Sequence, residues 1–262
     1  MNSIVCLKEV PDTETRIEVR GGKIAEEGIQ YVVNPYDEFA LEEALRWQEA
    51  HGGKVTLISL GPERARESIL KGLAMGADEV YHLSDPAFLG GDAYATAQAL
   101  AAAIRKLGEY DVIFCGKQAV DDDNAAVGAM LAEMLDLPHV SVVTRLELAA
   151  DGRSVRAERE IEGGREVVET PLPAVLTAQK GLNEPRYPSF KGIRQARSKP
   201  FTQWGPGDVG LDPGTVGAAG ARLETIEILP PPERPAGRIV PGEPEEAARE
   251  VVRLLREEAR VI

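Results

Sequence analysis

The sequence predicts an α/β fold: a mostly parallel, Rossmann-like sheet flanked by helices, with an antiparallel insert and a C-terminal arm. Short apolar runs typical of buried strands alternate with longer segments in which apolar residues recur at helical spacing. Strands separated by helices of this length favour parallel pairing through right-handed crossovers. The pattern changes after Pro138, where hairpin signals replace helices, and again near Gly205, where glycine and proline become dense.

The first half of the chain supplies the parallel core. It opens with a short apolar strand at 4–7. The first helix is predicted to begin at Pro35 with Asn34 as its cap, because asparagine is favoured at the cap and proline at the first helical position. Further strands are predicted at 55–59, 79–83 and 112–115, and further helices at 63–75, at 92–107 and from 127 onward.

The next part of the chain reads as an antiparallel insert at about 141–170. Asp151-Gly152 and Gly163-Gly164 are turn signals between segments of alternating polarity. Three hairpin strands and one returning core strand are predicted at 141–150, 154–161, 166–170 and 174–178.

We divide the chain into an α/β domain at 1–190 and an extended arm at 191–262. The stretch 205–244 is too rich in glycine and proline, including Pro230-Pro231-Pro232, to build a core of its own. It leads into a helix at 245–258. That helix has an apolar face that either packs back on its own domain or clasps another chain; the face is formed by Ala248, Val251, Val252 and Leu255.

Composition narrows the function classes. The chain has 262 residues, 43% of them hydrophobic, and a formal net charge of −13, which argues against nucleic acid and anionic membranes as partners. No apolar stretch approaches the roughly 20 residues that span a bilayer. Cys6 and Cys115 fall in predicted buried strands and are expected to be reduced core residues. We therefore expect a cytoplasmic protein without membrane insertion.

Several common site patterns are missing from the sequence. It has neither G-x-x-x-x-G-K-[ST] nor G-x-G-x-x-G. His51, His82 and His139 lie far apart in sequence, and consecutive aspartates rarely converge on one ion, so no metal site is expected. No nucleophile and base are paired by spacing. We expect no catalytic residues.

The stretch 116–127 is the strongest candidate for a ligand site. It runs G-K-Q-A-V-D-D-D-N-A-A-V from a predicted strand into a predicted helix. In open α/β sheets ligands collect at such places, and the unpaired amides of a helix start favour a phosphate. Asn124, Ala125 and Ala126 are small enough to let a ligand approach the backbone. The alternative is that Asp121–Asp123 only cap the helix and complement its dipole.

A second unusual stretch follows the last core strand. Residues 180–188, K-G-L-N-E-P-R-Y-P, are too rich in turn formers to be helical. Leu182 on this loop is either tucked inward or presented to a partner.

Four motifs together carry a family resemblance. L-N-E-P-R-Y at 182–187, K-Q-A-V-D-D-D at 117–123, N-P-Y-D at 34–37 and A-M-G-A-D at 74–78 occur in this order. With these motifs the chain resembles the β subunit of electron-transfer flavoprotein, from its first strand to its final helix. The resemblance implies a heterodimer with an α subunit that holds most of one FAD. It also implies electron transfer from flavin dehydrogenases, such as the acyl-CoA dehydrogenases of fatty acid β-oxidation, to a membrane quinone reductase.

The resemblance also implies the site residues. The β subunit binds a structural AMP, at positions that correspond here to Cys6, Asn34, Pro35, Tyr36, Asp37, Leu60, Gly116, Lys117, Gln118, Ala119, Val120, Asp121, Asp122, Asp123, Asn124, Ala125, Ala126 and Val127. The loop that docks dehydrogenases, with Leu182 as its apolar anchor, corresponds to Leu182, Asn183, Glu184, Pro185, Arg186 and Tyr187. The three aspartates are then expected to point mostly away from the phosphate or to accept hydrogen bonds.

The chain departs from the family pattern at two places. Relatives often have a glutamine followed by threonine or valine where this chain has Ala126-Val127, so phosphate binding would rest on backbone amides. Thr13 stands where some relatives carry a tyrosine near the flavin. Three alternatives stay open: a bifurcating relative with a second FAD in place of AMP, a standalone adenine-nucleotide sensor, and an ATP-dependent enzyme of similar fold.

Overall fold

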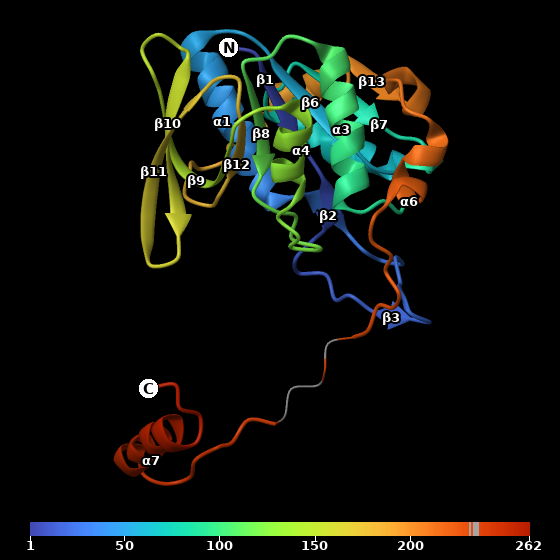
Figure 1. Cartoon of the computed structure of the whole chain (residues 1–262). Coiled ribbons are helices and arrows are strands. Elements are labelled where there is room, and N and C mark those ends of the chain that lie inside the picture. Colours follow the sequence, from blue (N-terminus) through green and yellow to red (C-terminus); the bar gives the residue numbers. More distant parts are fainter. Residues whose placement is uncertain (231, 233–235) are drawn as a thin grey trace. The chain divides into compact units, whose positions relative to one another are not determined.

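A computed structural model describes residues 1–230, 232 and 236–262 (Figure 1). The chain forms two units, one of residues 1–17 and 25–226 and the other of residues 18–24 and 227–262. The boundary predicted at 190 differs from this division, because β13 (Phe201–Trp204) pairs in parallel with β7 (Glu79–Leu83) and belongs to the main sheet. Part of the predicted proline-rich arm, at 231 and 233–235, lies outside the described residues.

The predicted α/β class is confirmed. The main sheet has nine strands in the order β11-β10-β9-β12-β8-β1-β6-β7-β13. The strands from β9 to β13 in this order pair in parallel, whereas β10 pairs antiparallel with both β9 and β11. Their bounds are β1 Ser3–Cys6, β6 Val55–Leu60, β8 Val112–Gly116, β9 His139–Leu148, β10 Ser154–Ile161, β11 Gly164–Pro171 and β12 Val175–Ala178.

The helices are α1 Pro35–His51, α2 Arg66–Met75, α3 Ala93–Leu107, α4 Val127–Leu135, α5 Phe190–Ala196, α6 Gly217–Gly220 and α7 Pro244–Glu257. The predicted helices lie close to their predicted positions, whereas α5 and α6 were not predicted. Short 3-10 turns precede α2 and interrupt the segments after β7 and β13, at Glu63–Ala65, Pro86–Phe88, Pro206–Val209 and Pro213–Thr215. No helix in the described ranges is both long and apolar enough to cross a membrane.

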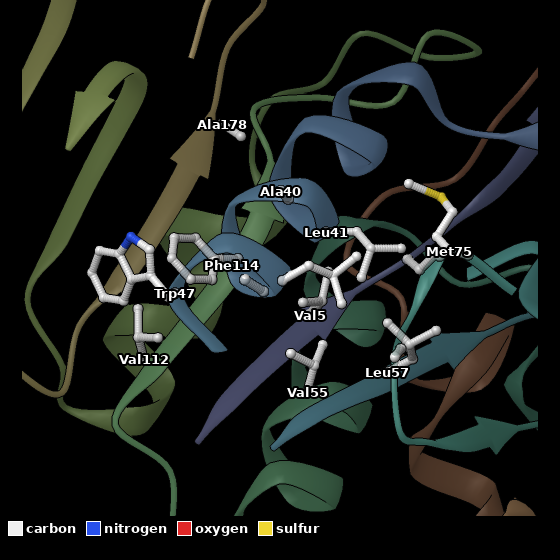
Figure 2. Packing of buried hydrophobic residues seen from close by; sticks show 14 of the residues in the cluster. Val5, Ala40, Leu41, Trp47, Val55, Leu57, Met75, Val112, Phe114 and Ala178 are labelled. Carbon is white, nitrogen blue, oxygen red and sulfur yellow. The ribbon is translucent and has the colours of Figure 1, made fainter. Parts of the chain in front are cut away.

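Two layers of side chains form the core on the two faces of the sheet. One layer joins the strands to α1 and α2, and the other joins them to α3 and α4. Figure 2 shows the first layer, where the rings of Trp47 and Phe114 meet edge to face with centroids 5.3 Å apart. Gly72 lets α2 lie close to the sheet, because a Cβ there would come within 2.6 Å of Leu57. Cys6 and Cys115 are buried in the second layer and are free thiols, as expected.

Sequence analysis missed the smaller strands. β2 (Glu9–Pro11) and β5 (Tyr31–Val33) form an antiparallel pair beside the main sheet. β3 (Val19–Arg20) and β4 (Lys23–Ile24) form a short hairpin in the second unit. These strands have two or three residues each, which is too short for a periodic signal.

The apolar face of α7 is uncovered in the described part of the chain. No residue of this helix is buried, and Val251, Val252 and Leu255 are 41%, 45% and 37% exposed. Acidic residues occupy its first turn and Arg256 its last, as its dipole favours.

Candidate functional site

The sequence-predicted ligand positions converge at one edge of the sheet. Cys6 ends β1, Leu60 ends β6 and Gly116 ends β8, and these three strands are neighbours in parallel. From β1 the chain winds to β6 and β7 on one side, and then returns to β8 on the other side. The carboxyl ends of β1 and β8 therefore flank a topological switch point, where open α/β sheets bind ligands.

Asn34 joins the start of α1 to the loop after β8. It occupies the N-cap position as predicted, but its side chain makes no capping bond within the helix. Its Nδ2 instead donates to Gln118 O at 2.8 Å and to Asp37 Oδ1 at 2.9 Å, and its Oδ1 accepts from Val120 N at 3.2 Å. The asparagine therefore fixes the loop to the helix.

Asp37 forms the second half of this connection. Its carboxylate accepts from Lys8 N at 2.7 Å, Gly116 N at 3.1 Å and the amide of Asn34. Gly116 must be glycine here, because a Cβ would lie 2.3 Å from Asp37 Oδ1. Burial raises the pKa of Asp37 to about 7, although the three donors oppose this shift. Asp37 is fully engaged by the protein, so its role is to position the loop.

This raised pKa predicts a pH dependence of stability. Between pH 3.8 and about 7 the unfolded chain loses the Asp37 proton while the folded chain keeps it. The unfolded state then binds fewer protons, so stability from this group is lost as pH rises through that window. We expect the stability difference between wild type and Asp37→Asn, measured by urea unfolding, to shrink as pH rises from 4 to 7. A difference that stays constant from pH 4 to 7 would mean that the three donors dominate over burial, because a lowered pKa places the titration below this window.

The three aspartates do not cap α4, which corrects that alternative. Asp121 Oδ1 pairs with Lys8 Nζ at 2.7 Å, Asp122 accepts from Asn124 N at 3.3 Å, and Asp123 accepts from the Gln118 side chain. Ala126 occupies the N-cap position of α4 and makes no side-chain capping bond. Among the described residues, no side chain therefore caps the first-turn amides of α4.

The loop before α4 has an unusual backbone. Asp123 and Ala125 adopt left-handed conformations, with φ of 52° and 50°. Asp123 N donates to Ala119 O at 2.9 Å, which closes a turn just before α4. Non-glycine residues with positive φ are uncommon and are retained where the surroundings fix them, often at binding sites. Within the described residues, no group of three or more His, Cys, Asp or Glu side chains is placed to hold a metal ion.

The second predicted stretch, 182–187, is held against α1. Asn183 Nδ2 donates to Glu43 Oε2 and to Phe39 O, both at 3.0 Å. Glu43 and Glu42 are buried in α1. Burial raises the pKa of Glu43, and hydrogen bonds from Asn183 and Trp47 partly offset this.

Arg186 makes the strongest contact of this loop. Its guanidinium pairs with Glu42 at 2.8 Å and with Glu49 at 2.5 Å, and its backbone N also donates to Glu42. Burial would raise the pKa of Glu42, but the bonds from Arg186 outweigh it and hold that pKa below its ordinary value. A bidentate arginine on a nearly buried carboxylate gives a rigid loop.

The sequence left open whether Leu182 is tucked inward or presented to a partner. The side chain is half-buried and packs against the first core layer. Tyr187, by contrast, is 93% exposed. Glu184 is also exposed, and Pro185 is half-buried.

The structure therefore brings the predicted residues together in two groups, both attached to α1. The residues predicted to bind a nucleotide lie at the start of the helix, and the loop 182–187 contacts residues from Phe39 to Glu49. Sequence analysis missed Lys8, Glu42 and Glu43. Lys8 lies just beyond the end of β1, and its place after a core strand is a signal that could have identified it. In the sequence Glu42 and Glu43 look like ordinary residues of a helix surface, and only the fold shows that they are buried.

The fold and this edge of the sheet define an α/β protein of Rossmann-like architecture with a strand–loop–helix candidate site at its switch point. Comparison with known families matches residues 21–209 to the electron transfer flavoprotein domain. The chain belongs to the electron transfer flavoprotein family.

Individual relatives cover nearly the whole chain. It is 44% identical to the electron transfer flavoprotein subunit beta of Thermoanaerobacterium thermosaccharolyticum, over 97% of this chain and 98% of that protein. It is 41% identical to the subunit of the same name in Bacillus subtilis over the full length of both. It is also 39% identical to the caffeyl-CoA reductase-Etf complex subunit CarD of Acetobacterium woodii, over 92% of each.

Proposed function

We propose that this chain is the β subunit of a heterodimeric electron-transfer flavoprotein. It binds a structural AMP and helps to house an FAD held mainly by the α subunit. It docks flavin dehydrogenases, such as acyl-CoA dehydrogenases, so that electrons pass to a membrane quinone reductase, and it works in the cytoplasm. The single observation that carries the AMP assignment is the Gly116–Val127 loop, fixed by Asn34 and Asp37 and leading into an uncapped helix start.

The residues present fit a monophosphate at this place. Backbone amides at the start of α4 favour a phosphate, and the left-handed Ala125 just before it carries only a methyl group. The carboxylate of Asp121 accepts a hydrogen bond from Lys8, and that of Asp123 accepts one from Gln118. These two carboxylates therefore repel a phosphate less than free carboxylates would. Each added phosphate would increase the repulsion from this acidic loop, which favours AMP over a triphosphate.

The test is the nucleotide content of the heterodimer. Co-expressed with its α partner and denatured in acid, the complex should release one FAD and one AMP. A bulky residue at Ala126 should remove the AMP and leave the FAD. A chain that is stable, soluble and nucleotide-loaded without any partner would instead indicate the adenine-nucleotide sensor.

A bifurcating carrier with a second FAD is the other candidate. The likeness to a subunit of a caffeyl-CoA reductase-Etf complex favours it, because that relative's name places it in a reductase complex. Release of two FAD and no AMP would replace our proposal with this one.

We expect Leu182→Ala to slow reduction of the heterodimer by its dehydrogenase about tenfold. The half-buried side chain also packs on the core, so the variant should lose about 1–2 kcal/mol of stability. Leu70→Ala is the matched control, because Leu70 is a half-buried leucine on the same core layer but lies in α2. Equal slowing in stopped-flow traces of both variants would reject the docking role.

A further inference from the structure

The two edges of the main sheet differ in length and regularity. At one edge β13 has only four residues and follows Pro200, which keeps that edge short. At the other edge β11 runs for eight residues and pairs with β10 without a register shift. In the described part of the chain, no strand pairs with the outer side of β11 (Figure 1). A long and regular edge strand of this kind is a template for pairing with another chain.

The backbone of β11 offers hydrogen-bonding groups along its outer side. Leu172 N donates to Arg153 O at 2.9 Å, at the end of the β10–β11 pair. In an antiparallel pair the bonded residues alternate, so every second residue counted back from Leu172 bonds to β10. Arg165, Val167 and Glu169 fall between those residues and direct their N–H and C=O groups outward. None of the three is proline, so each supplies one donor and one acceptor.

The side chains of these three residues are self-complementary. All three are exposed, Val167 at 49%. Arg165 and Glu169 lie two residues to either side of Val167 and carry opposite charges. Neither forms a salt bridge with another described residue, whereas Glu166 on the other face of the strand pairs with Arg159 at 2.9 Å. A second copy of the strand, turned antiparallel about Val167, would place Arg165 of each copy opposite Glu169 of the other.

We propose that β11 is an interface between two copies of this chain, paired antiparallel across a two-fold axis at Val167. The pairing joins the two nine-stranded sheets into one continuous sheet. Val167 bonds to Val167 of the second copy, and the contact between Arg165 and Glu169 occurs twice, as a two-fold interface requires. Opposite charges that face each other across two strands stabilise the pair.

Charge complementarity selects a second copy as the occupant of this edge. Natural edge strands are commonly protected from pairing by lysine, proline or a bulge. The stretch from Gly164 to Thr170 contains neither lysine nor proline, and its pairing with β10 has no bulge. The contact is shorter than a standard protein interface, so the dimer is weak and depends on concentration. The inference is independent of the proposed function, because β11 belongs to neither candidate site.

Sedimentation velocity of the full chain over a range of concentrations tests the charge pairs. Arg165→Glu and Glu169→Arg each bring like charges together at both contacts, so each should raise the dissociation constant of the dimer at least ~10-fold. The double variant restores both pairs in exchanged order and should return the constant to within ~3-fold of wild type. Arg153→Glu is the control, because Arg153 is exposed in the turn before β10 and lies off the edge. It should leave the constant unchanged.

A cysteine at position 167 tests the geometry. Cys6 and Cys115 are buried, so Val167→Cys adds one exposed thiol. Bonded residues that face each other in an antiparallel pair have Cα atoms about 5.5 Å apart, which a disulfide can bridge. Under mild oxidation Val167→Cys should form a covalent dimer at least ~10-fold faster than Arg153→Cys, and adding Arg165→Glu should remove this advantage.

Three results would overturn the β11 interface. The first is a wild-type chain that stays monomeric at every concentration. The second is a double variant that associates no better than the single variants, or equal cross-linking of the two cysteine variants. The third is loss of assembly with the α subunit in the single charge variants, which would place that subunit at this edge instead of a second copy.

Discussion

Asp37→Ala is expected to cost this chain about 3–5 kcal/mol of stability and to empty the proposed AMP site. The substitution removes the acceptor of three donors; Lys8 N and Gly116 N lose their partner in a partly buried place, and Asn34 Nδ2 keeps only its bond to Gln118 O. The loop after β8 would then lose one of its two attachments to α1. The measurements are urea unfolding of the chain and the AMP content of the heterodimer.

Asp78→Ala is the matched control for this loss. Asp78 accepts from Val55 N at 2.8 Å and from Gln48 Nε2 at 2.7 Å, just before β7 and away from the candidate site. It should lower stability by a similar mechanism and leave AMP in place. If both variants retain AMP, the positioning role assigned to Asp37 is wrong.

Removal of residues 243–262 is expected to weaken heterodimer formation at least ~100-fold, or about 3 kcal/mol, as burial of an apolar helix face would predict. In the described part of the chain, Val251, Val252 and Leu255 are exposed. Burial of these three side chains against the α subunit would explain why α7 has one apolar face and one polar face. The dissociation constant, measured by analytical ultracentrifugation of the mixed subunits, checks this.

The finer variant keeps the helix and changes only its face. Val251→Ser, Val252→Ser and Leu255→Ser should reproduce most of the loss, whereas Glu246→Gln with Arg249→Gln, on exposed polar positions, should not. An unaltered dissociation constant after truncation would show that the face is covered within its own chain.

Periodicity was enough to predict the class of fold and most element positions. β7 and β10 were placed at their observed bounds, because alternation and turn signals are local properties. β13 was missed, because Phe201–Trp204 is a four-residue edge strand that follows Pro200 and precedes Gly205-Pro206. Because β13 belongs to the main sheet, the first unit extends beyond the predicted boundary at 190 and ends at Ile226.

The candidate site was only partly predictable. The stretch 116–127 stood out from the sequence because its glycine, small residues and helix start are local. The sequence could not show that Asn34 bonds Gln118 as well as Asp37 of its own helix, since the contact with Gln118 joins residues 84 positions apart. For the same reason it could not decide whether Leu182 lies inside or outside.

Helix α1 also limits how the length of this chain can vary. Its first turn holds the loop after β8 through Asp37, and its middle holds the docking loop through Glu42 and Glu43. One residue inserted between them would turn everything beyond it by about 100° and advance it by about 1.5 Å, so the two loops could no longer both be engaged. Insertions and deletions are therefore expected to accumulate in the hairpin turns at Asp151-Gly152 and Gly163-Gly164, while the spacing from residue 37 to residue 43 stays constant.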